Sequence, residues 1–482
     1  MSLSLHYGVV SSLGSGVCSI NGLVLGFVGQ VYDIRLMTST SSGLVVNLTR
    51  DTTGNLTVSS LLFNPTDRIS VGGLVTGRPS LASLVLGDFL LGGMLDPLGN
   101  VLLQSSTVSS EYAWLIESPS IGLIDRQSVF EPLQSGLLSI DAMVPVGRGQ
   151  RELILGDRYT GKTSIGVDFI LNQRYEKSVC VYAAIGQKAS SILEVFLSLI
   201  ARGALDYIVV LVASSSVSSV SQYLSGYTGC AICDFFMLVR QLGSLLFLDD
   251  LSKHAVAYRE IYLLLRRPPG REAYPGEIFF VHSRLLERSA LLSASLGGGS
   301  STALPVIETL GGDVSAYITT NVISITDGQL FLSVDLFLSG IRPAIDVGLS
   351  VTRVGSAAQW DGMKLVGGSY KLQLAQYAEL QSFSQFSGDL GSDTKARLLS
   401  GASLVELFKQ VNGSPLSLSY QLSLLSVVSQ SILEYLSLDR ITFFVSYPTS
   451  VPSWVFCCLP TLYLGLSITR LNLTLAPSSS PV

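Results

Sequence analysis

Residues 152–171 read ELILGDRYTGKTSIGVDFIL. Within it, residues 156–163 fit the spacing G-x-x-x-x-G-K-[ST], with a short apolar run before them and a longer one after them. The pattern is typical of a phosphate-binding loop that joins a buried strand to a helix. A chance Gly/Lys turn is the alternative, and the flanking apolar runs argue against it. The sequence therefore predicts a nucleotide-binding α/β domain.

The chemistry of such a loop assigns roles to its residues. Consecutive backbone N–H groups and the N-terminus of the following helix form a concave site for phosphate oxygens. We expect Lys162 to reach the β- and γ-phosphates and the Thr163 hydroxyl to ligate Mg²⁺. The other loop residues expected at the nucleotide are Asp157, Arg158, Tyr159, Thr160, Gly161 and Ser164.

A second carboxylate is expected where a protein of this class holds the water shell of its metal. The apolar run 245–248 is followed by Asp249 and Asp250. We predict that Asp249 contacts Mg²⁺ through water. The alternative is that this acidic pair only caps the next helix, a role that suits Asp250.

Hydrolysis would further require a group that orients or deprotonates water and a cation that neutralises the transition state. The predicted strand 179–184 is followed by Gln187, whose neutral amide cannot accept a proton. Because some nucleotidases use Gln to position water, the residues alone leave open whether the nucleotide is cleaved or only held.

The composition sets limits on the class of protein. Apolar residues make up 48% of the 482 residues and charged residues only 13%, about half the usual share. We therefore expect partner chains to cover much of the surface. A net charge of −5 without a block of Lys and Arg argues against nucleic-acid binding. The most apolar run, 454–468, is too short to cross a bilayer, and no signal or transit peptide is predicted.

Cysteines and histidines show no pattern typical of a metal site. The lone C-x-x-C, Cys230 to Cys233, lacks a second pair at zinc-site spacing. His6, His254 and His282 are far apart in the sequence. We expect structural roles for all five side chains.

The pattern of apolar residues divides the chain into three regions. Residues 1–77 alternate short apolar runs with turn residues, which predicts a small β-barrel or sandwich. Residues 78–355 alternate strand and helix signals, which predicts an α/β domain with a mostly parallel sheet. Residues 356–482 read as helices up to about 440, and the remainder is unassigned. The strands predicted in the middle region are 152–155, 179–184, 208–213, 245–248, 277–281, 319–325 and 350–354.

Several long stretches resemble the α subunits of F-type ATP synthases. They include IDRQSVFEPLQSGLLSIDAMVPVGRGQRELILGDRYTGKTS (124–164), AIGQKAS (184–190), DDLSKHAVAYRE (249–260) and GIRPAIDVGLSVTRVGSAAQ (340–359). The resemblance runs from about Gly8 to Arg440 and is most specific over 118–359. It implies an N-terminal β-barrel, a central RecA-like P-loop domain and a C-terminal α-helical domain.

The resemblance also implies how the chain works. In this family, α subunits alternate with catalytic β subunits in a hexamer around the central stalk γ subunit, and a peripheral stalk contacts the head. Catalytic β subunits carry Glu as the general base at the position of Gln187, so Gln implies a site that holds Mg-ATP without cleaving it. Arg353 matches the arginine finger, the side chain that reaches into a neighbouring β site. Such fingers contribute about 10³–10⁵ in rate to related phosphoryl transfers.

Weaker correspondences concern the base of the bound ATP or ADP. Arg342 and Pro343 match a pair that lines the adenine pocket. Gln410 and Asn412 match a segment at the purine, where the family usually has Gln at the second position. Tyr159 also stands where the family usually has Gln, and we hypothesise that its ring stacks on adenine.

The family's N-terminal arm is nearly absent from this sequence, so we expect the peripheral stalk to attach differently. We expect membrane association only through the complex, at the matrix face of the mitochondrial inner membrane, with plastid thylakoid or bacterial plasma membrane as alternatives. Two other functions stay open. One is a self-sufficient homohexameric P-loop ATPase that positions water with Gln187, and the other is a nucleic-acid translocase.

Overall fold

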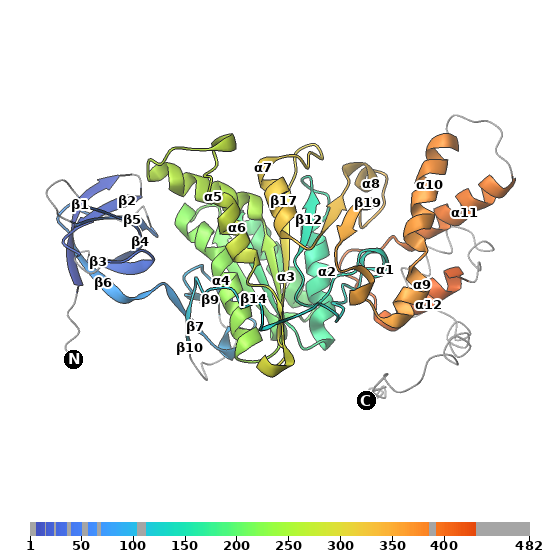
Figure 1. Cartoon of the computed structure of the whole chain (residues 1–482), viewed down its shortest axis with the longest axis horizontal. Coiled ribbons are helices and arrows are strands. Elements are labelled where there is room, and N and C mark those ends of the chain that lie inside the picture. Colours follow the sequence, from blue (N-terminus) through green and yellow to red (C-terminus); the bar gives the residue numbers. More distant parts are fainter. Residues whose placement is uncertain are drawn as a thin grey trace.

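The molecule has three parts in chain order: a barrel, an α/β domain and a group of helices (Figure 1). The computed structural model describes residues 6–14, 16–23, 26–35, 40–50, 56–64, 69–103, 112–384 and 392–429. This architecture confirms the predicted fold class. The unassigned stretch after 440 and the apolar run 454–468 lie outside the described residues.

The N-terminal part is a closed barrel with strand order β1-β2-β5-β4-β3-β6. Ile20 and Val58, from β2 and β5, are among the side chains buried inside it. Strand β6 continues four residues past the predicted boundary at 77. The strands are β1 (His6–Gly14), β2 (Val17–Asn21), β3 (Gln30–Arg35), β4 (Thr40–Arg50), β5 (Leu56–Leu62) and β6 (Leu74–Leu81).

The middle domain is built on a sheet with the order β19-β18-β12-β17-β15-β13-β14-β8-β9. Strands β18, β12, β17, β15, β13, β14 and β8 run parallel, and the edge strands β19 and β9 are antiparallel to their neighbours. The bounds are β8 (Met94–Leu95), β9 (Val101–Leu103), β12 (Glu152–Gly156), β13 (Val179–Gln187), β14 (Ile208–Ser214), β15 (Gly243–Asp249), β17 (Ser300–Glu308), β18 (Gly328–Leu332) and β19 (Ile345–Thr352). Strands β7 (Ser83–Leu86) and β10 (Tyr112–Leu115) form a separate two-stranded sheet. Strands β11 (Arg126–Gln127) and β16 (Leu291–Leu292) pair with each other and extend the main sheet, because β16 also pairs with β17.

Helices cover both faces of this sheet, so its central strands are apolar on both sides. In β12, Leu153 and Leu155 belong to one hydrophobic core, and Ile154 belongs to the other. The first core includes residues of α4 (Ser219–Leu238), α5 (Leu251–Leu264), α6 (Ile278–Leu286) and α7 (Tyr317–Ile325). The second includes residues of α1 (Leu138–Met143), α2 (Lys162–Asn172) and α3 (Ala189–Ala201). The short α8 (Val334–Leu338) follows β18.

Two of the predicted strands are wrong. Residues 277–281 and 319–325 lie in α6 and α7. In α7, Ile318, Val322 and Ile325 are buried at the spacing of one helix face. Short apolar runs rich in Ile, Val and Phe fit a buried strand or a buried helix equally well, which explains the error. Their places in the sheet are taken by β17 and β18, which the sequence analysis missed.

The C-terminal helices pack against the second core of the α/β domain. They are α9 (Asp361–Gly367), α10 (Tyr370–Ser384), α11 (Ser392–Leu407) and α12 (Leu418–Ser429). Leu407 and Leu425 join the core. Gln421 donates from Nε2 to the buried Asp141 at 2.8 Å, which ties α12 to α1. Within the described ranges, none of the helices combines the length and the apolar character that a bilayer crossing requires.

The buried histidines and cysteines lie in the packed interior. His254 Nδ1 and His282 Nε2 are 3.4 Å apart, so the fold joins two residues that are distant in sequence. Burial lowers the pKa of His254 to about 4 and that of His282 to about 3. Cys230 and Cys233 are free and buried in α4. The side chain of His6 lies outside the described part of the chain.

The close approach of α2 to the sheet gives a testable constraint. A Cβ on Gly166 would overlap the ring of Phe247 in β15. Gly→Ala in a helix is normally stabilising by about 1 kcal/mol, but here overpacking should reverse the sign and cost about 1–3 kcal/mol. Urea unfolding of Gly166→Ala measures this. Gly276→Ala, whose Cβ would meet open space, is the control and should change little; equal behaviour of the two variants would contradict the packing.

Candidate nucleotide-binding site

The phosphate-binding loop connects β12 to α2 at the carboxyl edge of the parallel strands. Gly161 precedes α2 with φ +94°, a left-handed conformation that glycine adopts without steric cost. A Cβ on Gly156 would lie 2.8 Å from the Cβ of Leu332 in the neighbouring strand β18. The two glycines of the motif are thus required by backbone conformation and by close packing. The first turn of α2 therefore directs its free N–H groups toward the loop.

The ammonium group of Lys162 lies over this loop. Its Nζ donates to the carbonyl oxygen of Gly156 at 2.7 Å and also to that of Asp157. Burial lowers the pKa of Lys162, and nearby carboxylates, including Glu308, Asp250 and Asp249, oppose that shift. Phosphate oxygens entering the loop would compete with the two carbonyls for the ammonium group.

Thr163 and Asp249 are brought together although 86 residues separate them. Asp249 ends β15 with only 4% of its surface exposed. Its Oδ2 accepts from the Thr163 hydroxyl at 2.9 Å and from the Tyr182 hydroxyl at 3.0 Å. Hydroxyl and carboxylate oxygens are the ligands that Mg²⁺ prefers, so the donor set fits this ion. The sequence did not indicate Tyr182, because a tyrosine within a buried strand has the same pattern as an ordinary core residue.

Gln187 and Asp250 flank this carboxylate. Gln187 is the last residue of β13, and its Nε2 donates to the backbone oxygen of Asp249 at 3.3 Å. Asp250 caps α5 by accepting from the Lys253 N–H at 2.7 Å. Burial raises the pKa of Asp250 to about 6. Asp250 therefore stabilises the start of α5, whereas Asp249 contacts Thr163 of the phosphate-binding loop.

Two further contacts fix the loop from the side of β17. Asp157 Oδ1 accepts from the Thr309 hydroxyl at 2.6 Å and from the Gly312 N–H at 3.0 Å. Glu308, at the end of β17, forms an ion pair with the exposed Arg158. Glu308 and Thr309 were not predicted, since no motif marks the end of a strand that was itself missed.

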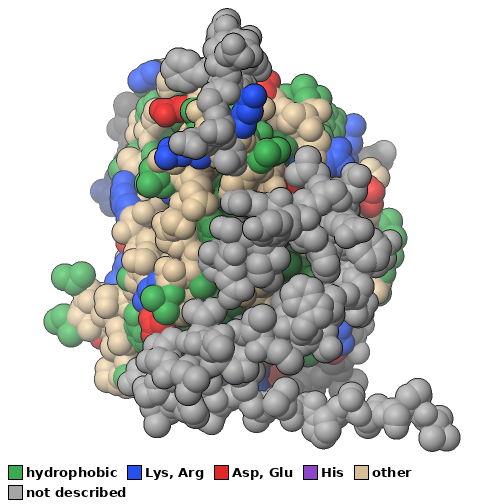
Figure 2. Space-filling view, turned by 90° about the vertical axis from the view of Figure 1, so that its right-hand side faces the viewer, with side chains coloured by type: hydrophobic (Ala, Val, Ile, Leu, Met, Phe, Trp, Pro, Cys, Tyr) green, Lys and Arg blue, Asp and Glu red, His purple; other side chains and the backbone are tan. Residues whose placement is uncertain are grey.

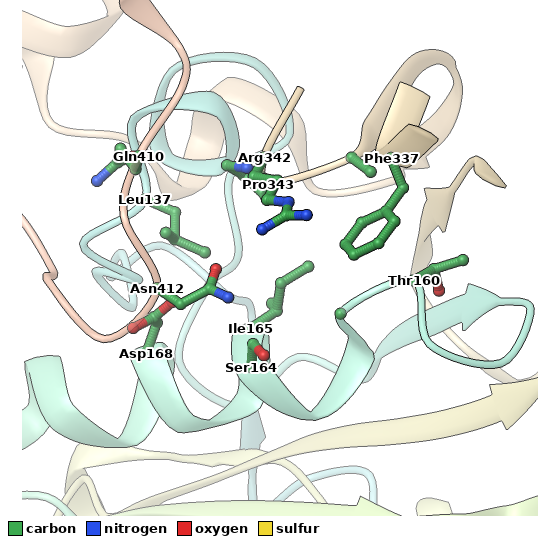
Figure 3. A pocket seen from close by; sticks show the side chains of 12 residues that line it. Leu137, Thr160, Ser164, Ile165, Asp168, Phe337, Arg342, Pro343, Gln410 and Asn412 are labelled. Carbon is green, nitrogen blue, oxygen red and sulfur yellow. The ribbon is translucent and has the colours of Figure 1, made fainter. Parts of the chain in front are cut away.

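A pocket that is partly open to solvent lies beside the loop (Figure 3). Its walls come from α2, from α8 with the residues that follow it, and from the segment after α11. The predicted residues that line it are Thr160, Gly161, Ser164, Arg342, Pro343, Gln410 and Asn412. Their convergence from three separate stretches of sequence makes this pocket the candidate site for the base and ribose.

The structure adds lining residues that the sequence did not single out. Phe337 offers an aromatic face, and the guanidinium of Arg342 lies 4.6 Å from the centre of its ring. Asp168, on α2, faces Asn412 across the lower part of the pocket (Figure 3). Burial raises the pKa of the Asp168 carboxyl to about 6. A partly protonated carboxyl in a pocket is a group that can donate a hydrogen bond as well as accept one.

Gln410 and Tyr159 sit differently from the other predicted residues. The Gln410 amide accepts from the Leu138 N–H at 2.7 Å and donates to the Gly136 carbonyl at 3.1 Å, so it joins two parts of the wall. Tyr159 has φ +63° and is 91% exposed, outside the lining of the pocket. Stacking of Tyr159 on adenine and contact of Gln410 with the purine stay predictions.

Arg353 lies far from its own phosphate-binding loop. Thr352 pairs with Gly328, and Gly328 pairs with Glu152, so Arg353 follows the level at which β12 begins. The loop starts at the opposite end of β12, about 13 Å away at 3.3 Å per residue. This span exceeds the length of an arginine side chain. Arg353 is exposed, and its side chain makes no hydrogen bond or ion pair with the described residues.

The contacts of Asp249 yield a stability prediction. Tyr182→Phe removes one of two hydroxyl donors to a buried carboxylate, which should cost about 1.5–3 kcal/mol. Tyr370→Phe is the matched control, because that buried hydroxyl donates to a neutral carbonyl, that of Leu425, at 2.8 Å. Its loss should cost about 0.5–1.5 kcal/mol. Urea unfolding compares them, and a larger cost for Tyr370→Phe would refute the role given to Tyr182.

Two family models match this chain. Residues 136–352 match the nucleotide-binding domain of the ATP synthase alpha/beta family, and residues 359–449 match the C-terminal domain of the ATP synthase alpha/beta chain. The first match contains the phosphate loop, Gln187 and Asp249, and together the two cover more than half of the sequence. The chain therefore belongs to the ATP synthase alpha/beta family, whose members are nucleotide-binding subunits of a hetero-oligomeric complex.

Proposed function

We propose that this chain is the non-catalytic α subunit of an F-type ATP synthase, and that it lends Arg353 to the adjacent catalytic β site during proton-driven ATP synthesis. The observation that carries the proposal is Gln187 at the end of β13, where its amide contacts the backbone of Asp249. The catalytic β subunits of the family that the sequence resembles carry Glu there as the general base, and the amide of Gln187 cannot accept a proton at working pH. The nucleotide of this site is therefore held rather than cleaved.

Residues of the chain suit the binding of Mg-ATP. Lys162 would contact the β- and γ-phosphates, while Thr163 and Asp249 would hold Mg²⁺, Asp249 through water. When bound, the ion neutralises part of the phosphate charge. Phe337 and Arg342 would face the base in the adjacent pocket.

The position of Arg353 supports action in trans. Its guanidinium stays charged at working pH and offers a fork of donors to phosphate oxygens. The phosphates bound by its own chain are beyond its reach, so only another chain can supply the phosphate. Leu349 and Val351, on the same edge strand β19, are 52% and 50% exposed. Apolar side chains on an exposed strand edge are typical of a surface that a neighbouring protein covers.

The remaining parts of the proposal concern partners and location. Catalytic β subunits would alternate with this chain around the central stalk γ subunit, and a peripheral stalk would contact the head. The complex would lie at the matrix side of the mitochondrial inner membrane, with a plastid thylakoid or bacterial plasma membrane as the alternatives. Membrane association would occur through the complex.

The two other functions find less support. A self-sufficient ATPase would have to position water with Gln187, but the Gln187 amide donates to the backbone oxygen of Asp249. The nearby carboxylate of Glu308 forms an ion pair with Arg158. A translocase would need a basic track for phosphates. On the coloured surface of Figure 2, Lys and Arg side chains are scattered among acidic and apolar ones.

Removal of the guanidinium tests the proposal. In the reconstituted complex with β subunits, Arg353→Ala should lower the rate of ATP hydrolysis by about 10³-fold or more, because the transition state loses a cation. Nucleotide binding to the Lys162 site should not change. Arg240→Ala, which removes an arginine paired with Asp88 at the surface, is the control and should keep the rate. An Arg353→Ala complex with the full rate would rule out the finger.

A further inference from the structure

The amino end of β12 carries a buried polar cluster that the proposed function does not use. We call Gln150, Glu152 and Thr352 the Gln150 cluster. Gln150 and Glu152 have no exposed surface, at 0% each. Buried polar groups cost free energy unless they are hydrogen-bonded, so a cluster at this place calls for a physical reason.

The amide of Gln150 uses both of its N–H donors and its carbonyl oxygen. Its Nε2 donates to Glu152 Oε2 at 2.7 Å and to the Thr352 hydroxyl oxygen at 3.1 Å. Its Oε1 accepts from the Gly147 N–H at 2.7 Å. Two donors and one acceptor in this geometry are a property of an amide, which neither a carboxylate nor an apolar side chain of equal length can supply.

Glu152 is the buried carboxyl that accepts a hydrogen bond from Gln150 in this cluster. Burial raises the pKa of its carboxyl well above the usual value, and the charge of Asp327 raises it further. The carboxyl packs directly on Gly328 in β18, where a Cβ would overlap both of its oxygens. The backbone of Gly328 therefore bounds the Glu152 carboxyl on the side of β18. Among the described residues, its Oε1 has no hydrogen-bond partner, and Oε2 accepts from Gln150.

A second set of contacts holds the residue that follows Thr352. The backbone N–H of Arg353 donates to the carbonyl oxygen of Asp327 at 2.8 Å. The Asp327 carboxylate accepts from Arg151 through Nε at 3.0 Å and through the second guanidinium nitrogen at 2.8 Å. Thr352 therefore contacts Gln150 directly. Arg353 is connected to the next residue, Arg151, through Asp327.

We propose that Gln150 is a positioning residue for the arginine finger, because its amide fastens Thr352, the residue before Arg353, to Glu152 in the central strand β12. The proposal rests on the proposed role of Arg353. The side chain of Arg353 finds no support among the described residues, so its backbone determines where the guanidinium can reach. A misplacement of about 1 Å at a reacting centre can cost about 10²-fold in rate.

Gln150→Met tests the proposal in the reconstituted complex with β subunits. Methionine keeps the length of the side chain and removes all three hydrogen bonds. We expect kcat for ATP hydrolysis to fall about 10–100-fold with KM unchanged, because the misplaced finger matters in the transition state. Trapping of Mg-ADP with aluminium fluoride, which mimics that state, should weaken in parallel. ATP binding to the Lys162 site should be unchanged.

Two further variants guard against a purely structural effect. Gln173→Met is the matched control, since this buried glutamine donates to the carbonyls of Gln134 and Phe169, away from β19. It should keep kcat. Thr352→Val keeps the β-branched shape and the Gln150–Glu152 contact but removes the acceptor oxygen, so it should reproduce the fall in kcat even if Gln150→Met assembles poorly.

Combination with Arg353→Ala separates this proposal from the proposed function. If Gln150 acts through the finger, Gln150→Met should lower the rate no further in an Arg353→Ala complex. A full additive loss there, or normal kcat in both Gln150→Met and Thr352→Val, would overturn the positioning role while leaving the finger intact. Normal kcat in Arg353→Ala alone would instead overturn the proposed function.

Discussion

The register of β12 between β17 and β18 fixes where the nucleotide site and Arg353 lie. The carboxyl end of this strand feeds the phosphate loop, and its amino end lies level with Thr352. One buried strand thus sets the place of the nucleotide at one edge of the sheet and the place of Arg353 at the other. Because Arg353 cannot reach the phosphate-binding loop of its own chain, one phosphate cannot contact both Lys162 and Arg353. A phosphate near Lys162 and a phosphate near Arg353 belong to different chains of the proposed assembly.

Neutral donors rather than cations satisfy most of the buried acids around this strand. Asp249 is bonded by two hydroxyls, and Asp141 by backbone N–H groups, a serine and Gln421. Such partners fix a carboxylate in place without cancelling its charge. For Asp249 this leaves an oriented negative group beside the loop, which is what a hydrated metal requires. Cationic partners stand elsewhere, as in the buried pair of Arg288 with Asp234.

Sequence predicts the parts of this site that local backbone geometry dictates. The loop, Asp249 and Gln187 could be found because each follows an apolar run at a spacing that the chemistry requires. Tyr182 and Phe337 could not, because a buried aromatic side chain has the same sequence signal in a core as in a site. Glu308 depends on which strands become neighbours, and the helical nature of 277–281 and 319–325 hid the true order. Asp168 lines the pocket because the distant segment with Gln410 and Asn412 lies beside α2. Contacts between segments that are distant in the sequence, rather than local propensity, determine these positions.

Because Gln187 offers no proton acceptor at the end of β13, we propose that this chain binds ATP without cleaving it. Phosphate release in a single turnover with radiolabelled ATP, measured on the purified chain without β subunits, tests this most directly. We expect the chain to bind ATP in a Lys162-dependent manner and to form no more phosphate than a Lys162→Ala variant does. Phosphate release by the isolated chain that Lys162→Ala abolishes would contradict it.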